Sequence, residues 1–151
     1  MGIAKGMVSF LSETGKKAGF QGRVLELGKQ DILCSSAEAE SILAQSGYPA
    51  RPFTGKQIDD VALFKALGFD YVESLDASNY EGAGLIADLN HPIPGDLKQR
   101  YDVVYDGGTS EHIFNFPQVL QNIFELLKPG GIVIHASPSH NHVDHGFYMF
   151  S

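Results

Sequence analysis

Four acidic residues stand at or near the ends of short apolar segments, and their chemistry is considered first. The segments are 23–28, 71–76, 84–88 and 102–106, and the acids are Glu26, Asp76, Asp88 and Asp106. A carboxylate only accepts hydrogen bonds, so its oxygens can hold the two neighbouring hydroxyls of a ribose, or accept from the exocyclic amine of adenine. The alternative is that these acids are helix caps or loop residues, where Asp is common.

A second group of reactive side chains, Glu111 and His112, follows the fourth segment. Either residue could remove the proton of a hydroxyl nucleophile, because histidine titrates near neutral pH and carboxylates serve as general bases. The alternative is that Glu111 caps a helix and His112 packs beside a ligand.

Four histidines gather near the end of the sequence: His135, His140, His142 and His145. The spacing His140-x-His142-x-x-His145 could supply imidazoles to zinc or another divalent ion. A metal site also needs a rigid, supported geometry. We therefore favour a polar loop that rims a ligand cleft, and we expect no metal.

Strand and helix patterns alternate along the chain, and these elements must position the acids. Strands are predicted at 23–28, 71–76, 84–88, 102–106 and 132–135, and helices at 7–19, 36–46, 58–67 and 117–127. The alternation predicts the α/β class, with a Rossmann-like open parallel sheet and helices on both faces. Ligands of such sheets bind outside the carboxyl ends of the strands, where the acids stand.

The last predicted helix carries the clearest apolar stripe. We expect one buried face there, formed by Val119, Leu120, Ile123, Phe124 and Leu127. The following Lys128-Pro129-Gly130-Gly131 is expected to close the helix, since Gly is favoured just past a helix end.

The composition favours a compact domain that binds a small ligand. The 151 residues are 43% hydrophobic and 19% charged, which is ordinary for a globular protein. We expect one domain over 1–151, with a leading helix in 1–20 and an α/β core in 21–151. The net charge of −7 disfavours nucleic acid as a partner. The lone Cys34 and the lack of a long apolar run predict a cytoplasmic protein without a membrane span.

Several of these segments occur in the order known from one enzyme family. They are Val24-Leu25-Glu26-Leu27-Gly28, Asp76, Ala87-Asp88-Leu89, Tyr101-Asp102-Val103-Val104, Glu111-His112 and Leu127-Lys128-Pro129-Gly130-Gly131. Over roughly residues 20–150 the chain resembles class I S-adenosylmethionine-dependent methyltransferases. The tail His145-Gly146-Phe147-Tyr148 is similar to members that act on small molecules or sugars.

The resemblance implies a role for each matching position. Glu26 and Gly28 would border the methionine end of S-adenosylmethionine, Asp76 would hold the ribose hydroxyls, and Asp88 with Leu89 would frame adenine. Asp106, Gly107 and Gly108 would line the floor beside the methyl group. Glu111, His112 and His145 are the candidate catalytic residues on the side of the methyl acceptor.

The chain departs from the family pattern at two places. Gln30 and Ile32 stand where the family has further glycines. S-adenosylmethionine has no phosphate that needs close backbone amides, so Gln30 and Asp31 could bind its amino acid end instead. The family also closes its sheet with a helix and two more strands, which we expect to be missing here. A second copy of the chain could then cover the exposed sheet edge.

The leading hypothesis is methyl transfer from S-adenosylmethionine to a small molecule or a sugar hydroxyl. One alternative is a non-catalytic, methyltransferase-like binding domain, and another is a metal-dependent hydrolase that uses the tail histidines. Two nucleotide sites are disfavoured. Gly15-Lys16-Lys17 and Gly55-Lys56-Gln57 lack the rest of a phosphate-binding loop, and the chain lacks the Gly-x-Gly-x-x-Gly of nicotinamide enzymes.

Overall fold

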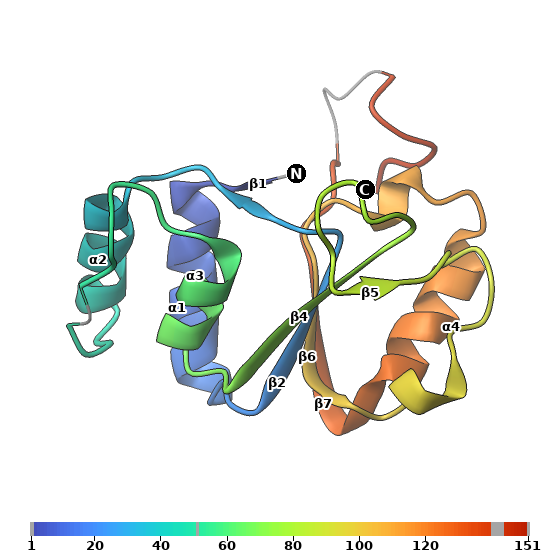
Figure 1. The fold of residues 1–151 in the computed structure, drawn as a ribbon, viewed down its shortest axis with the longest axis horizontal. Helices are drawn as coiled ribbons and strands as arrows, with labels where there is room; N and C mark the ends of the chain where they lie inside the picture. The colour runs from blue at the N-terminus through green and yellow to red at the C-terminus, as the bar shows by residue number, and fades with distance from the viewer. Residues whose placement is uncertain (1, 51, 140–143, 151) are drawn as a thin grey trace. The chain divides into compact units, whose positions relative to one another are not determined.

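The computed structural model describes residues 2–50, 52–139 and 144–150 (Figure 1). The chain forms two compact units, and each is described by itself. The strand unit comprises Arg23–Lys29 and Glu73–Ser151, and the helical unit comprises Gly2–Gly22 and Gln30–Val72. The expectation of one domain over 1–151 stays a prediction.

A five-stranded parallel sheet forms the centre of the strand unit. Its strands are β2 (Arg23–Leu27), β4 (Tyr71–Asp76), β5 (Leu85–Ile86), β6 (Tyr101–Asp106) and β7 (Leu127–His135). The first two residues of β4 are counted with the helical unit. The predicted α/β fold with an open parallel sheet is confirmed, and each predicted strand overlaps an observed one. The strands could be predicted because β2 and β6 consist largely of buried apolar residues, as expected for strands that are covered on both faces.

The strand order β5-β4-β2-β6-β7 places the first long strand of the sheet in the middle. From β2 the chain adds β4 and then β5 on one side, and β6 and then β7 on the other. In doubly wound sheets the order reverses at one such point, and the ligand crevice lies there, beyond the carboxyl ends of the strands. The point lies between β2 and β6, where Leu27 is paired with Asp106.

Helix α4 (Phe116–Leu126) packs on β6 and β7 within the strand unit (Figure 1). Pro117 in its first turn suits a helix start, because proline lacks the N–H that a first turn leaves unpaired. Val119, Ile123 and Leu126 are buried in a core cluster with Leu25 and other strand residues.

The prediction for the buried face of this helix is wrong. Leu120 is 45% exposed and Phe124 is 75% exposed, so the buried face is narrower than the apolar stripe. The predicted helix end is confirmed, because α4 ends at Leu126, but Lys128-Pro129-Gly130-Gly131 then lies inside β7, which begins at Leu127. A register shift opposite Tyr101–Val103 accommodates these residues, with Gly130 at a φ of 81°.

The helical unit contains helices α1 (Lys5–Ala18), α2 (Ser36–Gln45) and α3 (Asp60–Ala66). These confirm the three helices predicted before residue 70. A parallel pair of two-residue strands, β1 (Gly2–Ile3) and β3 (Asp31–Ile32), was not predicted. Strands this short carry no periodic pattern. Among the described residues, no helix has both the length and the apolar character needed to cross a membrane.

Candidate functional site

A cavity of about 270 Å³ lies in the strand unit, at the carboxyl ends of its strands. The residues that line it come from the ends of β2, β4 and β5 and from the segment after β6. They are Gly28, Leu75, Asp76, Ala77, Glu81, Ala87, Asp88, Leu89, Asn90, Thr109, His112 and Ile113. Ligand pockets usually measure roughly 300–1,000 Å³, so this cavity suits part of a small molecule. Its position matches the crevice expected for this type of sheet.

The turn after β2 forms one edge of the cavity. Gly28 has a φ of 71°, a conformation that costs a residue with a Cβ roughly 1–2 kcal/mol. Its N–H donates to the carbonyl of Leu75 over 2.8 Å, which ties the turn to β4. The Thr109 hydroxyl donates to the carbonyl of Leu27 and ties it to the segment after β6. The backbone of this turn therefore favours glycine at position 28.

Asp76 and Asp88 both line the cavity, in different local environments. Asp76 ends β4 half-buried, and the Ser78 N–H lies 3.4 Å from its Oδ1. Asp88 is exposed, and its Oδ1 accepts from the backbone N–H of Asn90 at 2.9 Å and from the side-chain amide at 2.8 Å. These hydrogen bonds lower the pKa of Asp88. Asp76 thus offers more unused acceptor capacity to a ligand.

The charged lining of the cavity is acidic. Asp76, Glu81 and Asp88 contribute carboxylates, and the lining residues that the structure describes include one histidine, His112, and neither lysine nor arginine. Such a cavity disfavours a phosphate and favours a ligand with positive charge.

Asp106 is placed differently from these acids. It is fully buried and is not among the residues that line the cavity. Its Oδ1 accepts from the N–H groups of Thr109 and Ser110, and its Oδ2 lies 2.9 Å from Nδ1 of His135. Burial raises the pKa of Asp106, but the hydrogen bonds from His135 and the segment after β6 outweigh this and lower it overall. This carboxylate therefore organises the turn that carries Thr109.

The other predicted cofactor residues are distributed as follows. Leu89 lines the cavity and is buried in the core cluster. Glu26 is buried within β2, and Gly107 and Gly108 continue the chain after β6, with Gly108 at a φ of 102°. Gln30 is buried and belongs to the helical unit. The structure thus brings Gly28, Asp76, Asp88 and Leu89 together around one hollow.

The three predicted catalytic residues also lie together. Glu111 and His112 belong to the 3₁₀ helix η2 (Ser110–His112), and His145 comes from the tail. Oε1 of Glu111 lies 3.6 Å from Nε2 of His145 and 3.9 Å from Nε2 of His112. The tail is anchored there, because the N–H groups of Phe147 and Tyr148 both donate to the carbonyl of Glu111. His140 and His142, the other residues of the tail motif, lie outside the described residues.

Sequence reasoning missed three polar residues of the cavity: Glu81, Asn90 and Thr109. Asn90 holds Asp88 and also pairs with the backbone of Asn115, whose N–H donates to its Oδ1 at 2.9 Å. Each of the three lies within a few residues after a strand end. That position is a usable signal, since loops at the carboxyl ends of parallel strands carry the ligand contacts.

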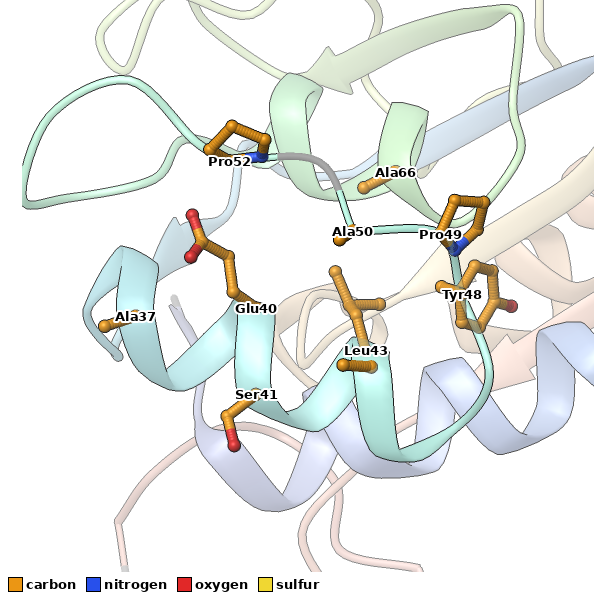
Figure 2. A pocket seen from close by; sticks show the side chains of 10 residues that line it. Ala37, Glu40, Ser41, Leu43, Tyr48, Pro49, Ala50, Pro52 and Ala66 are labelled. Atoms are coloured by element: carbon orange, nitrogen blue, oxygen red, sulfur yellow. The ribbon is translucent and has the colours of Figure 1, made fainter.

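A larger cavity of about 380 Å³ lies in the helical unit, between α2, the segment after it and α3 (Figure 2). Figure 2 shows mostly small or apolar side chains around it, among them Leu43, Pro49 and Ala66. Glu40 is the one carboxylate among the described lining residues, and its Oε1 accepts from the N–H of Phe53 at 2.6 Å. Several acids and a histidine converge instead on the cavity at the carboxyl ends of the strands, so that cavity is the candidate site.

No family model and no curated protein matches this chain. Among solved structures, one similar chain is the trans-methyltransferase CalH, crystallised in complex with SAH. The two share 20% sequence identity with a TM-score of 0.47. The alignment covers 93% of this chain and 38% of that one, so this chain spans less than half the length of CalH.

Proposed function

We propose that the strand unit binds S-adenosylmethionine and transfers its methyl group to a small molecule or a sugar hydroxyl. The observation that supports this best is Asp76, a half-buried carboxylate that ends β4 and lines the cavity at the switch point of the sheet. In doubly wound folds an acidic residue in the nucleotide crevice holds the ribose hydroxyls. Leu89, Ala87 and Ile113 supply apolar walls suited to adenine.

The charge of the cavity favours this adenosine compound over a nucleotide. A dinucleotide would bring a pyrophosphate beside Asp76, Glu81 and Asp88, and no lysine or arginine of the lining would compensate. S-adenosylmethionine carries a sulfonium and no phosphate, so the same carboxylates attract it. The loop after Gly28 lacks the further glycines of a phosphate-binding loop, which also favours S-adenosylmethionine over a nucleotide.

On the acceptor side, we propose that Glu111, His112 and His145 handle the proton of the hydroxyl. His112 lines the cavity and lies beside the buried Glu111, so it can face an acceptor while the carboxylate orients it. The acceptor oxygen would attack the methyl carbon as the carbon–sulfur bond breaks. S-adenosylhomocysteine leaves, and the hydroxyl proton passes to the cluster. Since the sulfonium is already a good leaving group, the main task of the protein is alignment.

Calorimetric titration of the purified chain with S-adenosylhomocysteine tests the cofactor proposal. We expect one site per chain, and Asp76→Asn should weaken it about tenfold to a hundredfold, as for loss of a charge-assisted hydrogen bond. Asp96→Asn is the matched control, because Asp96 is exposed and lies outside the cavity lining. A folded protein that binds neither S-adenosylhomocysteine nor S-adenosylmethionine would overturn the proposal, and so would an Asp76→Asn variant that binds as the parent does.

A turnover assay then separates the enzyme from a binding domain. The protein is incubated with S-adenosylmethionine and a panel of sugars and small alcohols, and formation of S-adenosylhomocysteine is measured. Turnover that depends on one of these acceptors supports the transferase. Tight cofactor binding without turnover on any acceptor would favour the non-catalytic domain instead.

A further inference from the structure

Glu111, His112 and His145 form the one His/Cys/Asp/Glu cluster with metal-ligand spacing among residues 2–50, 52–139 and 144–150. One ligand atom from each side chain lies within 4.8 Å of the others. The two imidazole rings stand 4.8 Å apart and tilted by 58°, so they do not stack flat on each other. Two histidines and one carboxylate are a ligand set used both for zinc and for non-haem iron.

The burial of Glu111 is the second observation that points to a ligand. The residue is 1% exposed, and its Oε2 has no hydrogen-bond partner within the part of the chain that the structure describes. A buried carboxylate oxygen normally finds a donor, because leaving it without one is costly. Oε1 is the oxygen that faces the two imidazoles, so a cation bound by both oxygens of the carboxylate would satisfy Oε2 as well.

The backbone around the cluster holds the tail histidine in place. A Cβ added to Gly146 would lie 2.8 Å from the carbonyl oxygen of Glu111 and 3.2 Å from Nδ1 of His112. Only a residue without a side chain lets the tail come this close to η2. With the two hydrogen bonds from Phe147 and Tyr148 to the same carbonyl, this contact fixes His145 against Glu111.

We propose that Glu111, His112 and His145 bind one divalent transition-metal ion of the class that prefers imidazole and carboxylate, such as Zn²⁺. With zinc–nitrogen and zinc–oxygen bonds of about 2.0–2.2 Å, ligand atoms of a tetrahedral site lie roughly 3.4 Å apart. The observed 3.6 Å and 3.9 Å separations are close to this value, so small side-chain rotations close the site.

The cluster is partly open to solvent. The side chains of His112 and His145 are each 40% exposed, which suits a site with an open position rather than a closed structural site. Because His112 also lines the cavity, an acceptor oxygen could bind the ion there, and its proton would then pass to solvent water, since the three side chains would be occupied as ligands. This role in the reaction rests on the proposed function, but the binding of the ion does not.

The test is a Zn²⁺ titration of chelator-treated, dialysed protein at pH 7.5, followed by calorimetry and by metal analysis after gel filtration. We expect one ion per chain, with affinity at least tenfold weaker in Glu111→Gln and in His145→Ala. Co²⁺ provides a second readout, because its visible spectrum reports the ligand geometry. Circular dichroism confirms that each variant is folded.

Two controls make the result specific. His91→Ala removes an exposed histidine of the strand unit, and a variant with both His140 and His142 replaced by Ala removes the other tail histidines. Both should bind Zn²⁺ as the parent does. Absence of binding in the parent overturns the proposal, as does binding that survives Glu111→Gln and His145→Ala. S-adenosylhomocysteine affinity, measured on the same samples, reports separately on the proposed function.

Discussion

At the residue scale, similar acids at successive strand ends occupy different environments. Asp76 and Asp88 line the cavity, whereas Asp106 is fully buried beside His135. The strand register explains the contact between Asp106 and His135, since the two residues are direct neighbours on β6 and β7. Asp106 therefore contributes to stability and to the shape of the turn, and Asp76 is the acid available to a ligand.

Asp106→Asn tests the structural role of this residue. The change removes the charge that faces His135 but keeps the side-chain shape, and we expect a loss of about 1–3 kcal/mol in the free energy of unfolding at pH 7. Urea unfolding of the variant beside Asp96→Asn measures the loss. An unchanged midpoint would show that the buried charge contributes nothing to stability.

The lowered pKa of Asp106 also predicts how the stability difference between the parent and this variant depends on pH. The pKa of Asp106 in the folded protein lies below its ordinary value of 3.8, so its stabilising effect is complete above that value. The effect is lost as the pH falls through the lowered pKa. The stability difference between the parent and Asp106→Asn should thus narrow as the pH falls below about 4.

At the element scale, capping explains why helix α2 begins where it does. Helix α2 starts with a complete capping box: the Ser35 hydroxyl accepts from the N–H of Glu38, and the Glu38 carboxylate accepts from the N–H of Ser35. Lys5 also pairs with this carboxylate, and these partners lower the pKa of Glu38 to about 2. The box is a local sequence feature, since Ser35 and Glu38 are three residues apart.

Ser35→Ala should destabilise the helical unit by about 1 kcal/mol, the usual cost of losing a helix cap. The pKa of Glu38 should also rise, because the Ser35 hydroxyl donates to its carboxylate. Thermal unfolding measures the first effect and an NMR titration the second. Ser41→Ala, a change on the same helix outside the cap, is the control. Equal stability of the two variants would contradict the capping argument.

At the scale of the whole molecule, charge decides which ligands are compatible. The chain carries a net charge of −7, and the lining of the candidate site adds three carboxylates without a lysine or arginine. Phosphate-bearing ligands are therefore opposed both by the local and by the overall field. A sulfonium compound is favoured by both.

Ligand-induced stabilisation checks this argument. S-adenosylmethionine at a hundred times its dissociation constant should raise the free energy of unfolding by about 2.7 kcal/mol. ADP at the same concentration should give no measurable shift, because its phosphates meet the acidic lining. Unfolding curves measured with each ligand test this, and stabilisation by ADP equal to that by S-adenosylmethionine would contradict the electrostatic argument.

The sequence alone was sufficient for features that depend on local pattern. The alternation of apolar strands with helices and the acids at strand ends follow from neighbouring residues, and the structure confirms the parallel α/β sheet that this alternation predicts. Local pattern also explains the errors. The apolar stripe of α4 includes Leu120 and Phe124, but only the packing against the sheet determines which part of that stripe is buried.

Tertiary structure decided every feature that joins distant segments. It separates the buried Asp106 from the open Asp76, and it brings His145 to Glu111 across more than 30 residues of chain. Burial and proximity of this kind depend on strand register and on the path of the tail. The spacing of residues along the sequence does not predict this burial or proximity, because residues far apart in the chain meet only when the sheet has formed.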